Sequence, residues 1–190
     1  MFRRLNPRSA AVFIYCALAF CFCMRVAQAE ESVSVEYKIK AAYLLNFAKF
    51  VEWPTNRFPT PTTPIRVGVI GKDPFGSDLE RTIGGRVIEG RKCEILRTDD
   101  AEAALSCHIV FISSSERRQL PDVLEKLHRG NVLTVGESEQ FTEQGGITQF
   151  YLYENTVRFH INQPAAEKAK LRISSKLLQV AKPPPGKEEK

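Results

Sequence analysis

The stretch YKIKAAYLLNFAKFVEWP, from Tyr37 to Pro54, is the part of the sequence on which the interpretation of the fold depends. On a helix with 100° per residue it carries two apolar stripes, where a surface helix has one. The first stripe contains Ile39, Ala42, Tyr43, Asn46, Phe50 and Trp53, and the second contains Ala41, Leu44, Leu45, Ala48 and Val51. Pro54 cannot continue a helix and disfavours the helical state of the preceding residue, so the helix is expected to end at Trp53. Both sides of this helix should therefore be covered.

The first stripe is expected to pack against a sheet through Tyr43, Phe50 and Trp53, so that Phe50→Ala would cost about 3–5 kcal/mol. Asn46 lies within this stripe and should have a defined hydrogen-bond partner, because an unpaired buried amide costs about 1–3 kcal/mol. For the second stripe two covers remain open: the C-terminal helix around Leu171–Leu178, or another protein chain. The second cover would make a partner or homodimer surface of Leu44, Leu45, Ala48 and Val51.

Residues 1–29 have the three parts of a secretory signal peptide. An apolar run at Ala10–Met24 and the cleavage sequence Ala27-Gln28-Ala29 follow the basic residues Arg3, Arg4 and Arg8. Arg25 interrupts the apolar run before it reaches the roughly 20 residues that a membrane-spanning helix needs. We therefore expect cleavage after Ala29 and a mature protein in the periplasm.

Removal of this segment changes the charge balance. The whole chain has 27 basic and 22 acidic residues, and residues 1–29 hold four of the basic ones and none of the acidic ones. The remaining 23 basic and 22 acidic residues give a net charge of only +1. No charge argument for nucleic-acid binding is left.

Residues 30–182 fit one domain of the α/β class. Ile65–Ile70 reads IRVGVI, an almost continuous apolar run typical of a strand that is buried on both faces. Further strands are predicted at Cys93–Leu96, Cys107–Ile112 and Val132–Val135, with helices from an N-cap at Asp73 to Ile83 and over Glu116–His128. This alternation predicts a three-layer sandwich around a mostly parallel, doubly wound sheet.

Near the C-terminus the pattern becomes that of an antiparallel hairpin. Ile147–Tyr153 and Thr156–Ile161 alternate in polarity and are separated by the two-residue connection Glu154-Asn155. Pro164–Ala181 should form a closing helix that is interrupted near Lys170. The final residues, 183–190, are rich in proline and charge and are predicted to be a disordered tail.

No catalytic constellation, metal site or cofactor site is recognisable in the sequence. Gly71–Gly76 has the glycine spacing of a phosphate loop, but Ser77 stands where such a loop requires lysine. Ser113-Ser114-Ser115 has no nucleophile elbow around it. The histidines of the mature chain have no partner at ligand spacing: His108, His128 and His160. These observations favour a protein that is not an enzyme and needs no cofactor.

The Tyr37–Pro54 stretch and several later motifs resemble the YfiR-like family of bacterial periplasmic proteins, whose first helix reads much like IKAAFLYNFAKFVEWP. The later motifs are Pro74-Phe75-Gly76, Cys107 before Ile109–Ile112, Gly145-Gly146-Ile147, the group Phe159, Ile161 and Asn162, and LRISSKLLQVA at Leu171–Ala181. They follow in the expected order, and the resemblance covers residues 37–181. Its structural motif residues are Tyr43, Asn46, Phe50, Trp53 and Asn162.

The resemblance also bears on the two cysteines of the mature chain, Cys93 and Cys107. Members of the family often pair a cysteine of the first strand with the one at Cys107, but that position here looks like Gly68. In a doubly wound sheet the first strand usually separates the second from the third, which would place Cys93 and Cys107 about 9–10 Å apart. A disulfide needs Cα atoms within about 7 Å. Whether these two cysteines are bonded stays open at this point.

The resemblance implies a regulator that binds the periplasmic region of an inner-membrane diguanylate cyclase and holds it inactive. Cyclic-di-GMP output, and with it biofilm formation, would then respond to envelope conditions. An alternative is a periplasmic small-molecule-binding sensory module whose occupancy is read by a membrane partner. That alternative rests on the turns Gly71–Gly76 and Ser113–Ser115, because open α/β sheets bind ligands at the carboxyl ends of their strands.

Overall fold

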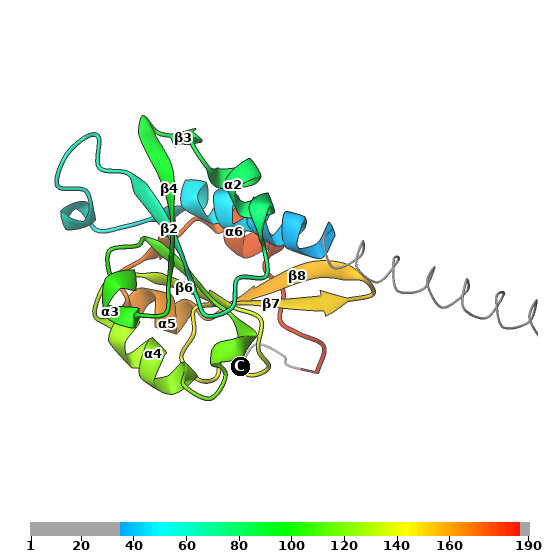
Figure 1. Ribbon diagram of the computed structural model, residues 1–190. Coiled ribbons are helices and arrows are strands. Elements are labelled where there is room, and N and C mark those ends of the chain that lie inside the picture. The colour runs from blue at the N-terminus through cyan, green and yellow to red at the C-terminus, as the bar shows by residue number, and fades with distance from the viewer. Residues whose placement is uncertain (1–34, 187–190) are drawn as a thin grey trace, which may run out of the picture. The chain divides into compact units, whose positions relative to one another are not determined.

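A computed structural model describes residues 35–186 of the chain (Figure 1). It contains a seven-stranded sheet with the strand order β3-β4-β2-β5-β6-β7-β8. The strands are β2 (Ile65–Ile70), β3 (Val87–Ile88), β4 (Arg91–Thr98), β5 (Ile109–Ile112), β6 (Leu133–Gly136), β7 (Thr148–Tyr153) and β8 (Thr156–Ile161). The five central strands are parallel, and only β3 and β8 at the two edges run antiparallel to their neighbours. The predicted mixed α/β class with a mostly parallel sheet is confirmed.

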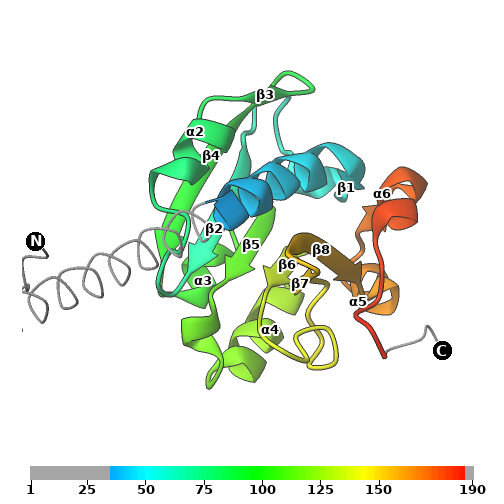
Figure 2. The same cartoon turned by 90° about the vertical axis from the view of Figure 1, so that its right-hand side faces the viewer.

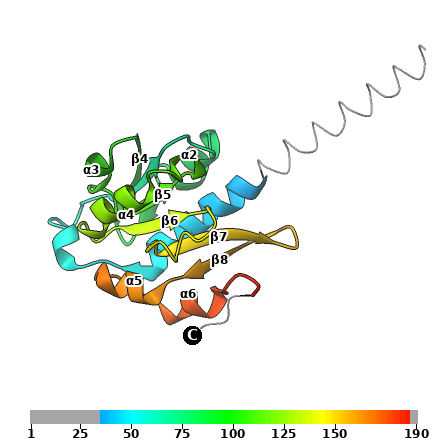
Figure 3. The same cartoon turned by 90° about the horizontal axis from the view of Figure 1, so that it is seen from below.

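Helices cover both faces of this sheet. The first helix spans residues 35–50 and is followed by α2 (Ser77–Ile83), α3 (Ala101–Ala104), α4 (Leu120–His128), α5 (Gln163–Lys168) and α6 (Ser175–Val180), with short 3-10 turns η1 (Thr55–Arg57) and η2 (Ser114–Glu116). Figure 2 shows the first helix, in blue and cyan, running across the sheet. In Figure 3, α5 and α6 lie on one side of the sheet and α3 and α4 on the other.

The alternation of side chains along the central strands produces two separate cores. Ile109 and Phe111 of β5 face the core that contains the first helix, α2, α5 and α6. Val110 and Ile112 of the same strand face the core built with α3 and α4. All four residues of β5 are buried, as expected for a strand with helices on both sides.

The first helix ends three residues earlier than its sequence predicts. Val51–Glu52 forms strand β1, which pairs antiparallel with β9 (Arg172–Ile173) in a small second sheet. The backbone N–H of Ser174 donates to the carbonyl oxygen of Phe50 at 2.9 Å and extends this pairing. Pro54 requires the chain to leave the helix, and the pairing with a segment about 120 residues away decides where it does so.

The orientation of the first helix differs from the prediction in part: Tyr43 and Trp53 pack against the core as expected, but most of the second stripe is buried more deeply than the first. Leu44, Ala48 and Val51 of the second stripe are 0%, 5% and 5% exposed and belong to the core. In the first stripe, Ile39 and Phe50 are 41% and 36% exposed. Phe47, which neither stripe included, is fully buried against Phe150 and Phe159. Both stripes were apolar, so helical periodicity could not determine which of them faces the sheet.

The burial of the second stripe also removes the predicted contact surface. Leu44, Ala48 and Val51 are covered by the chain itself, so of the four candidate contact residues only the half-buried Leu45 retains appreciable exposure. Phe50 packs less than expected, and its truncation cannot cost what a fully buried phenylalanine would cost. Asn46 is half-buried, and no hydrogen bond to its amide is found within residues 35–186. The amide of Asn46 is accessible to solvent, so the prediction that it has a defined hydrogen-bond partner in the protein is wrong.

The connections also differ locally from the prediction. Asp73 does not cap α2, which begins at Ser77 after Gly76. Its carboxylate instead accepts from the backbone N–H of Phe75 at 2.7 Å and pairs with Arg97 at 2.6 Å. The predicted interruption of the closing helix near Lys170 is confirmed, with Lys170 at φ 56°, but the two parts, α5 and α6, are separated further than expected because β9 lies between them. The edge pairing of β9 with β1 is a long-range contact that no local pattern indicates.

The C-terminal hairpin joins β7 to β8 through Glu154 and Asn155, which have φ values of 49° and 59°. These left-handed values at both turn residues match the twist of a two-residue hairpin. The chain after α6 is held against this hairpin, because Tyr151 donates to the carbonyl oxygen of Pro183 at 3.2 Å. Pro183, the first residue of the predicted tail, is thus anchored. Residues 187–190 and the predicted signal peptide at residues 1–29 lie outside the described part of the chain.

Cys93 and Cys107 are both buried and both free. Strand β2 lies between β4, which contains Cys93, and β5, which follows Cys107. The two side chains also belong to different cores on opposite faces of the sheet. No disulfide joins them, because a bond would have to cross a strand of the sheet.

Candidate functional site at the end of the first helix

Trp53 is the centre of a rigid aromatic group just after the first helix. Its indole Nε1–H donates to the carbonyl oxygen of His108 at 3.1 Å. The ring meets Phe58 edge-on at a centroid distance of 6.5 Å and His108 edge-on at 5.7 Å. One hydrogen bond and two ring contacts therefore fix the orientation of the indole.

Phe58 lies between an arginine and a histidine. The guanidinium of Arg91, from β4, lies 4.2 Å from the ring centroid of Phe58 and donates to the carbonyl oxygens of Thr60 and Thr63 at 2.8 and 3.0 Å. The imidazole of His108 stacks on Phe58 at 4.6 Å with an interplanar angle of 12°. The loop after Pro54 is thus tied to the sheet.

His108 is neutral in this environment. Burial, followed by the charge of Arg57, lowers its pKa from 6.5 to about 4. Its Nδ1 accepts from the backbone N–H of Arg66 at 3.1 Å, so the proton is on Nε2, 3.4 Å from the carbonyl oxygen of Arg57. His108 therefore links strand β2, through Arg66, to the turn η1, through Arg57. This is a structural role, which agrees with the lack of a partner at ligand spacing in the sequence.

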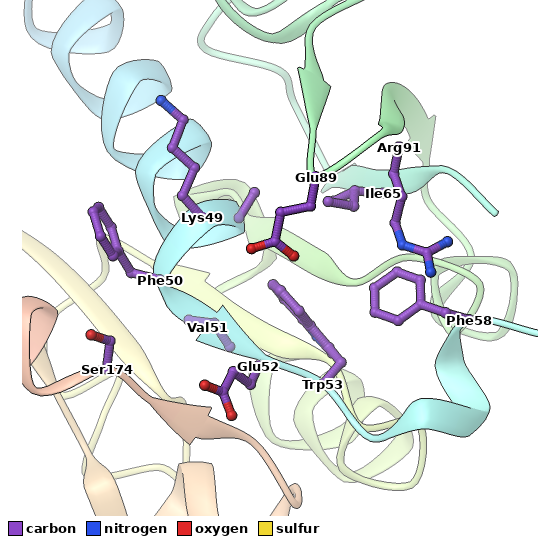
Figure 4. Close-up of a pocket in the computed structure, with 11 residues that line it drawn as sticks. Lys49, Phe50, Val51, Glu52, Trp53, Phe58, Ile65, Glu89, Arg91 and Ser174 are labelled. Carbon is purple, nitrogen blue, oxygen red and sulfur yellow. The ribbon is translucent and has the colours of Figure 1, made fainter. Parts of the chain in front are cut away.

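These groups form part of the wall of an open pocket of about 450 Å³ (Figure 4). The first helix contributes Ala48, Lys49 and Phe50, β1 contributes Val51 and Glu52, and the remaining lining residues are Trp53, Phe58, Ile65, Glu89, Arg91 and Ser174. The wall thus combines aromatic rings with carboxylates and cations. Pockets of this size accommodate small molecules or a protruding side chain.

The predicted motif residues are only partly brought together here. Phe50 and Trp53 line the pocket, whereas Tyr43 packs against Phe150 and Phe159 at centroid distances of 6.0 and 5.1 Å. Asn162 lies elsewhere and is a structural residue. It caps α5 by accepting from the backbone N–H of Ala165 and donates to the carbonyl oxygen of Thr142 at 2.8 Å.

Sequence reasoning missed Glu89 and Arg91 because their role depends on a contact between distant segments. The only local signal is the Glu89-Gly90 dipeptide between Val87–Ile88 and a longer apolar–polar run, which is typical of a tight hairpin. Nothing in that pattern indicates that this hairpin lies beside the end of the first helix.

The carboxyl ends of β2 and β5, which the alternative interpretation requires to be open for a ligand, are filled by the chain. The hydroxyl of Ser115 accepts from the backbone N–H of Lys72 at 3.0 Å and donates to Glu116 at 2.9 Å. A Cβ placed on Gly71 would lie 2.4 Å from the same hydroxyl oxygen. The two turns therefore pack on each other, and this edge offers less room for a ligand than the topology suggests.

A second polar group, also missed, lies at the end of β6. Lys40 of the first helix is buried and pairs with Glu137 at 2.5 Å, and Tyr37 donates to the same carboxylate at 3.1 Å. The Lys40 ammonium also lies 4.4 Å from the ring centroid of Tyr37. This arrangement satisfies a buried charge and ties the helix to the sheet, and it is structural in character.

Two kinds of feature are not found within residues 35–186. No group of three or more histidine, cysteine, aspartate or glutamate side chains could hold a metal ion. No helix in that range is long and apolar enough to cross a membrane.

The comparison with protein families decides where this chain belongs. A family model described as YfiR/HmsC-like matches residues 37–182. The chain belongs to the YfiR/HmsC-like family. The family is a regulatory one, and membership supports the signalling theme that the resemblance implies. The YfiR/HmsC-like match begins at the first helix, so it includes the helix, its pocket and both cores.

Other comparisons add distant likenesses only. No curated protein matches the sequence. In the comparison with solved structures, eleven chains match. A conserved domain protein from Vibrio cholerae O1 biovar El Tor is 11% identical with a TM-score of 0.47, covering 61% of this chain and 53% of its own. An ABC domain in complex with L-Trp from Streptococcus pneumoniae is 10% identical with a TM-score of 0.42, covering 67% and 56%. This YfiR/HmsC-like chain thus spans little more than half the length of either structure.

Proposed function

We propose that this protein binds the periplasmic region of an inner-membrane diguanylate cyclase and represses it, so that cyclic-di-GMP signalling and biofilm formation depend on it. The observation that carries the proposal is the YfiR/HmsC-like match over residues 37–182. The protein would act as a binding module in the periplasm after removal of residues 1–29.

The proposed contact surface is the outer stripe of the first helix, which comprises Ile39, Ala42, Asn46 and Phe50. Ala42 is exposed, as are Ile39 and Phe50, and Asn46 between them is half-buried. Together these residues form an apolar strip along the helix with one central amide. Such a strip is typical of a surface that another chain covers. A second copy of this chain is the competing occupant.

The test of repression is genetic. Deleting the gene should raise cellular cyclic-di-GMP, and expression of the full chain should lower it again. Ile39→Glu should keep the melting temperature and lose repression, because it places a charge on the outer stripe. Val180→Glu is the matched control, since Val180 is also an exposed aliphatic residue, 59% exposed in α6. An unchanged cyclic-di-GMP level after deletion would reject the proposed function.

The periplasmic sensory module stays the second candidate, and the pocket beside Trp53 favours it. A ligand that binds only the folded protein raises its melting temperature by mass action. A thermal-shift screen against periplasmic metabolites finds such ligands, and the cyclic-di-GMP level with each ligand separates the two candidates: the bound ligand changes that level in a sensory module and leaves it unchanged in a simple repressor.

A further inference from the structure

The carboxylate of Glu89 is directed into the pocket from an unusual backbone position. Glu89 and Gly90 form the two-residue turn between β3 and β4, with φ values of 48° and 79°. Glycine, asparagine and aspartate are the residues favoured at such left-handed positions. Glu154 has the same conformation in the other hairpin, at φ 49°, so conformation alone does not distinguish Glu89. Its direction does, because Figure 4 shows its carboxylate pointing towards the ring of Trp53.

Glu89 makes no ion pair or hydrogen bond with any residue in the range 35–186. The cations of the same pocket are directed elsewhere. Arg91 lies over Phe58 and donates to two backbone carbonyls. The ammonium of Lys49 extends along the first helix, away from Trp53 (Figure 4). The carboxylate of Glu89 thus points towards an indole in the same pocket. A cation bound between the two would be attracted by the carboxylate and, where it lies over the ring, by the π-electrons of the indole.

The same pocket already contains an example of this chemistry. The Arg91 guanidinium lies 4.2 Å from the centroid of Phe58, within the range of a cation–π contact. Tryptophan is the strongest of the aromatic side chains in such contacts. Among the cation–aromatic contacts of residues 35–186, none uses Trp53. Its ring is nevertheless held in place by the His108 carbonyl and by Phe58.

We propose that this pocket binds an organic cation, an alkylammonium or guanidinium group, over the indole of Trp53 and against the carboxylate of Glu89. The volume of about 450 Å³ is that of a small-molecule site. Glu52 supplies a second carboxylate to the wall, and its pairing with Arg172 at 3.7 Å joins two exposed side chains. A dication therefore fits the pocket better than a monocation, since a weak surface pair exchanges readily.

The inference goes beyond the proposed function and does not depend on it. The cation could be a free small molecule or a basic side chain of the partner protein, and the chemistry is the same in both. Trp53 is the only tryptophan of the chain, so intrinsic fluorescence reports on this pocket alone. A titration needs only the purified mature protein and no cyclase.

The experiment titrates the mature protein with putrescine and agmatine while its tryptophan emission is recorded, with 1,4-butanediol as the uncharged probe of matched length. A saturable change is expected with both cations and not with the diol. Glu89→Gln should weaken binding by at least about fivefold, and added salt should weaken it as well. Glu154→Gln is the matched control and should bind like the wild type, because it removes the same charge from the same kind of turn.

The proposal is overturned if the cations give no saturable change, or if Glu89→Gln binds them as well as Glu154→Gln does. Circular dichroism of both variants verifies that they are folded, and the salt dependence of the wild type provides a test that needs no variant.

Competition identifies the source of the cation. If agmatine displaces the periplasmic region of the cyclase, the partner supplies the basic group; if both bind together, a free cation is the ligand.

Discussion

Replacing Gly68 with cysteine should create a disulfide with Cys107. Gly68 lies in β2, and a Cβ placed on it would be 2.9 Å from the sulfur of Cys107. In a disulfide the Cβ of one cysteine lies about 3 Å from the sulfur of the other, as follows from an S–S bond of about 2.05 Å. The 2.9 Å between the Cβ on residue 68 and the Cys107 sulfur is too short for a non-bonded contact, but it is close to the distance found in a disulfide. The free thiol of Cys107 is buried, and burial raises its pKa.

The size of the effect follows from the chain that the new bond would close. The loop from residue 68 to residue 107 contains about 40 residues, for which loop-closure entropy predicts about 4 kcal/mol of stabilisation. The comparison is between the oxidised and reduced forms of the same Gly68→Cys variant, so that the cost of the added side chain largely cancels. The variant Gly68→Ala measures the cost of the added side chain separately. It should be less stable than the wild type, because its Cβ would lie too close to the Cys107 sulfur for two atoms that are not bonded.

The assay combines urea unfolding, with and without dithiothreitol, with titration of free thiols in the unfolded protein. After oxidation by oxidised glutathione, the mature variant should contain one free thiol, that of Cys93. Adding Cys107→Ser to the variant should abolish the effect of dithiothreitol on the unfolding midpoint. Three free thiols after oxidation would refute the reasoning, since Gly68 and Cys107 would then not be in contact as described.

Three further predictions concern stability. In urea titrations, Leu44→Ala should lower the free energy of unfolding by about 3–5 kcal/mol and Phe50→Ala by only about 1–2 kcal/mol. The reason is that Leu44 is fully buried and Phe50 is not. Equal losses would contradict the observed orientation of the helix. Since the pKa of His108 is about 4 in the folded protein and about 6.5 when unfolded, it should remove about 3 kcal/mol of stability as the pH falls from about 6.5 to about 4. Unfolding of wild type and His108→Gln across that range measures this, and identical pH profiles would argue against it. Lys40→Met should cost about 3 kcal/mol by leaving the half-buried carboxylate of Glu137 without its cation, and the double variant Lys40→Met/Glu137→Met should recover much of the loss. A double variant as unstable as the single one would show that packing, and not charge, decides.

Local sequence patterns were sufficient for the elements whose side chains are buried on both faces. IRVGVI and IVFI predict β2 and β5 because no amphipathic helix has such continuous apolar runs. The break near Lys170 was also predicted, and the structure places that residue at a positive φ. The candidate pocket could not be predicted, because it combines the end of the first helix with a hairpin turn at Glu89 that is about 35 residues further along the chain.

The sequence by itself determined the mixed α/β class, the family and the motif at Tyr37–Pro54, since periodicity and residue type are local properties. Tertiary structure alone decided which residues of the first helix face the core. Leu44 and Phe50 are equally apolar, and what separates them is the position of Phe47 between Phe150 and Phe159. The tertiary structure also decided that the helix stops at residue 50. After that residue, the backbone N–H and C=O groups of β1 form hydrogen bonds with β9, which is distant in the sequence.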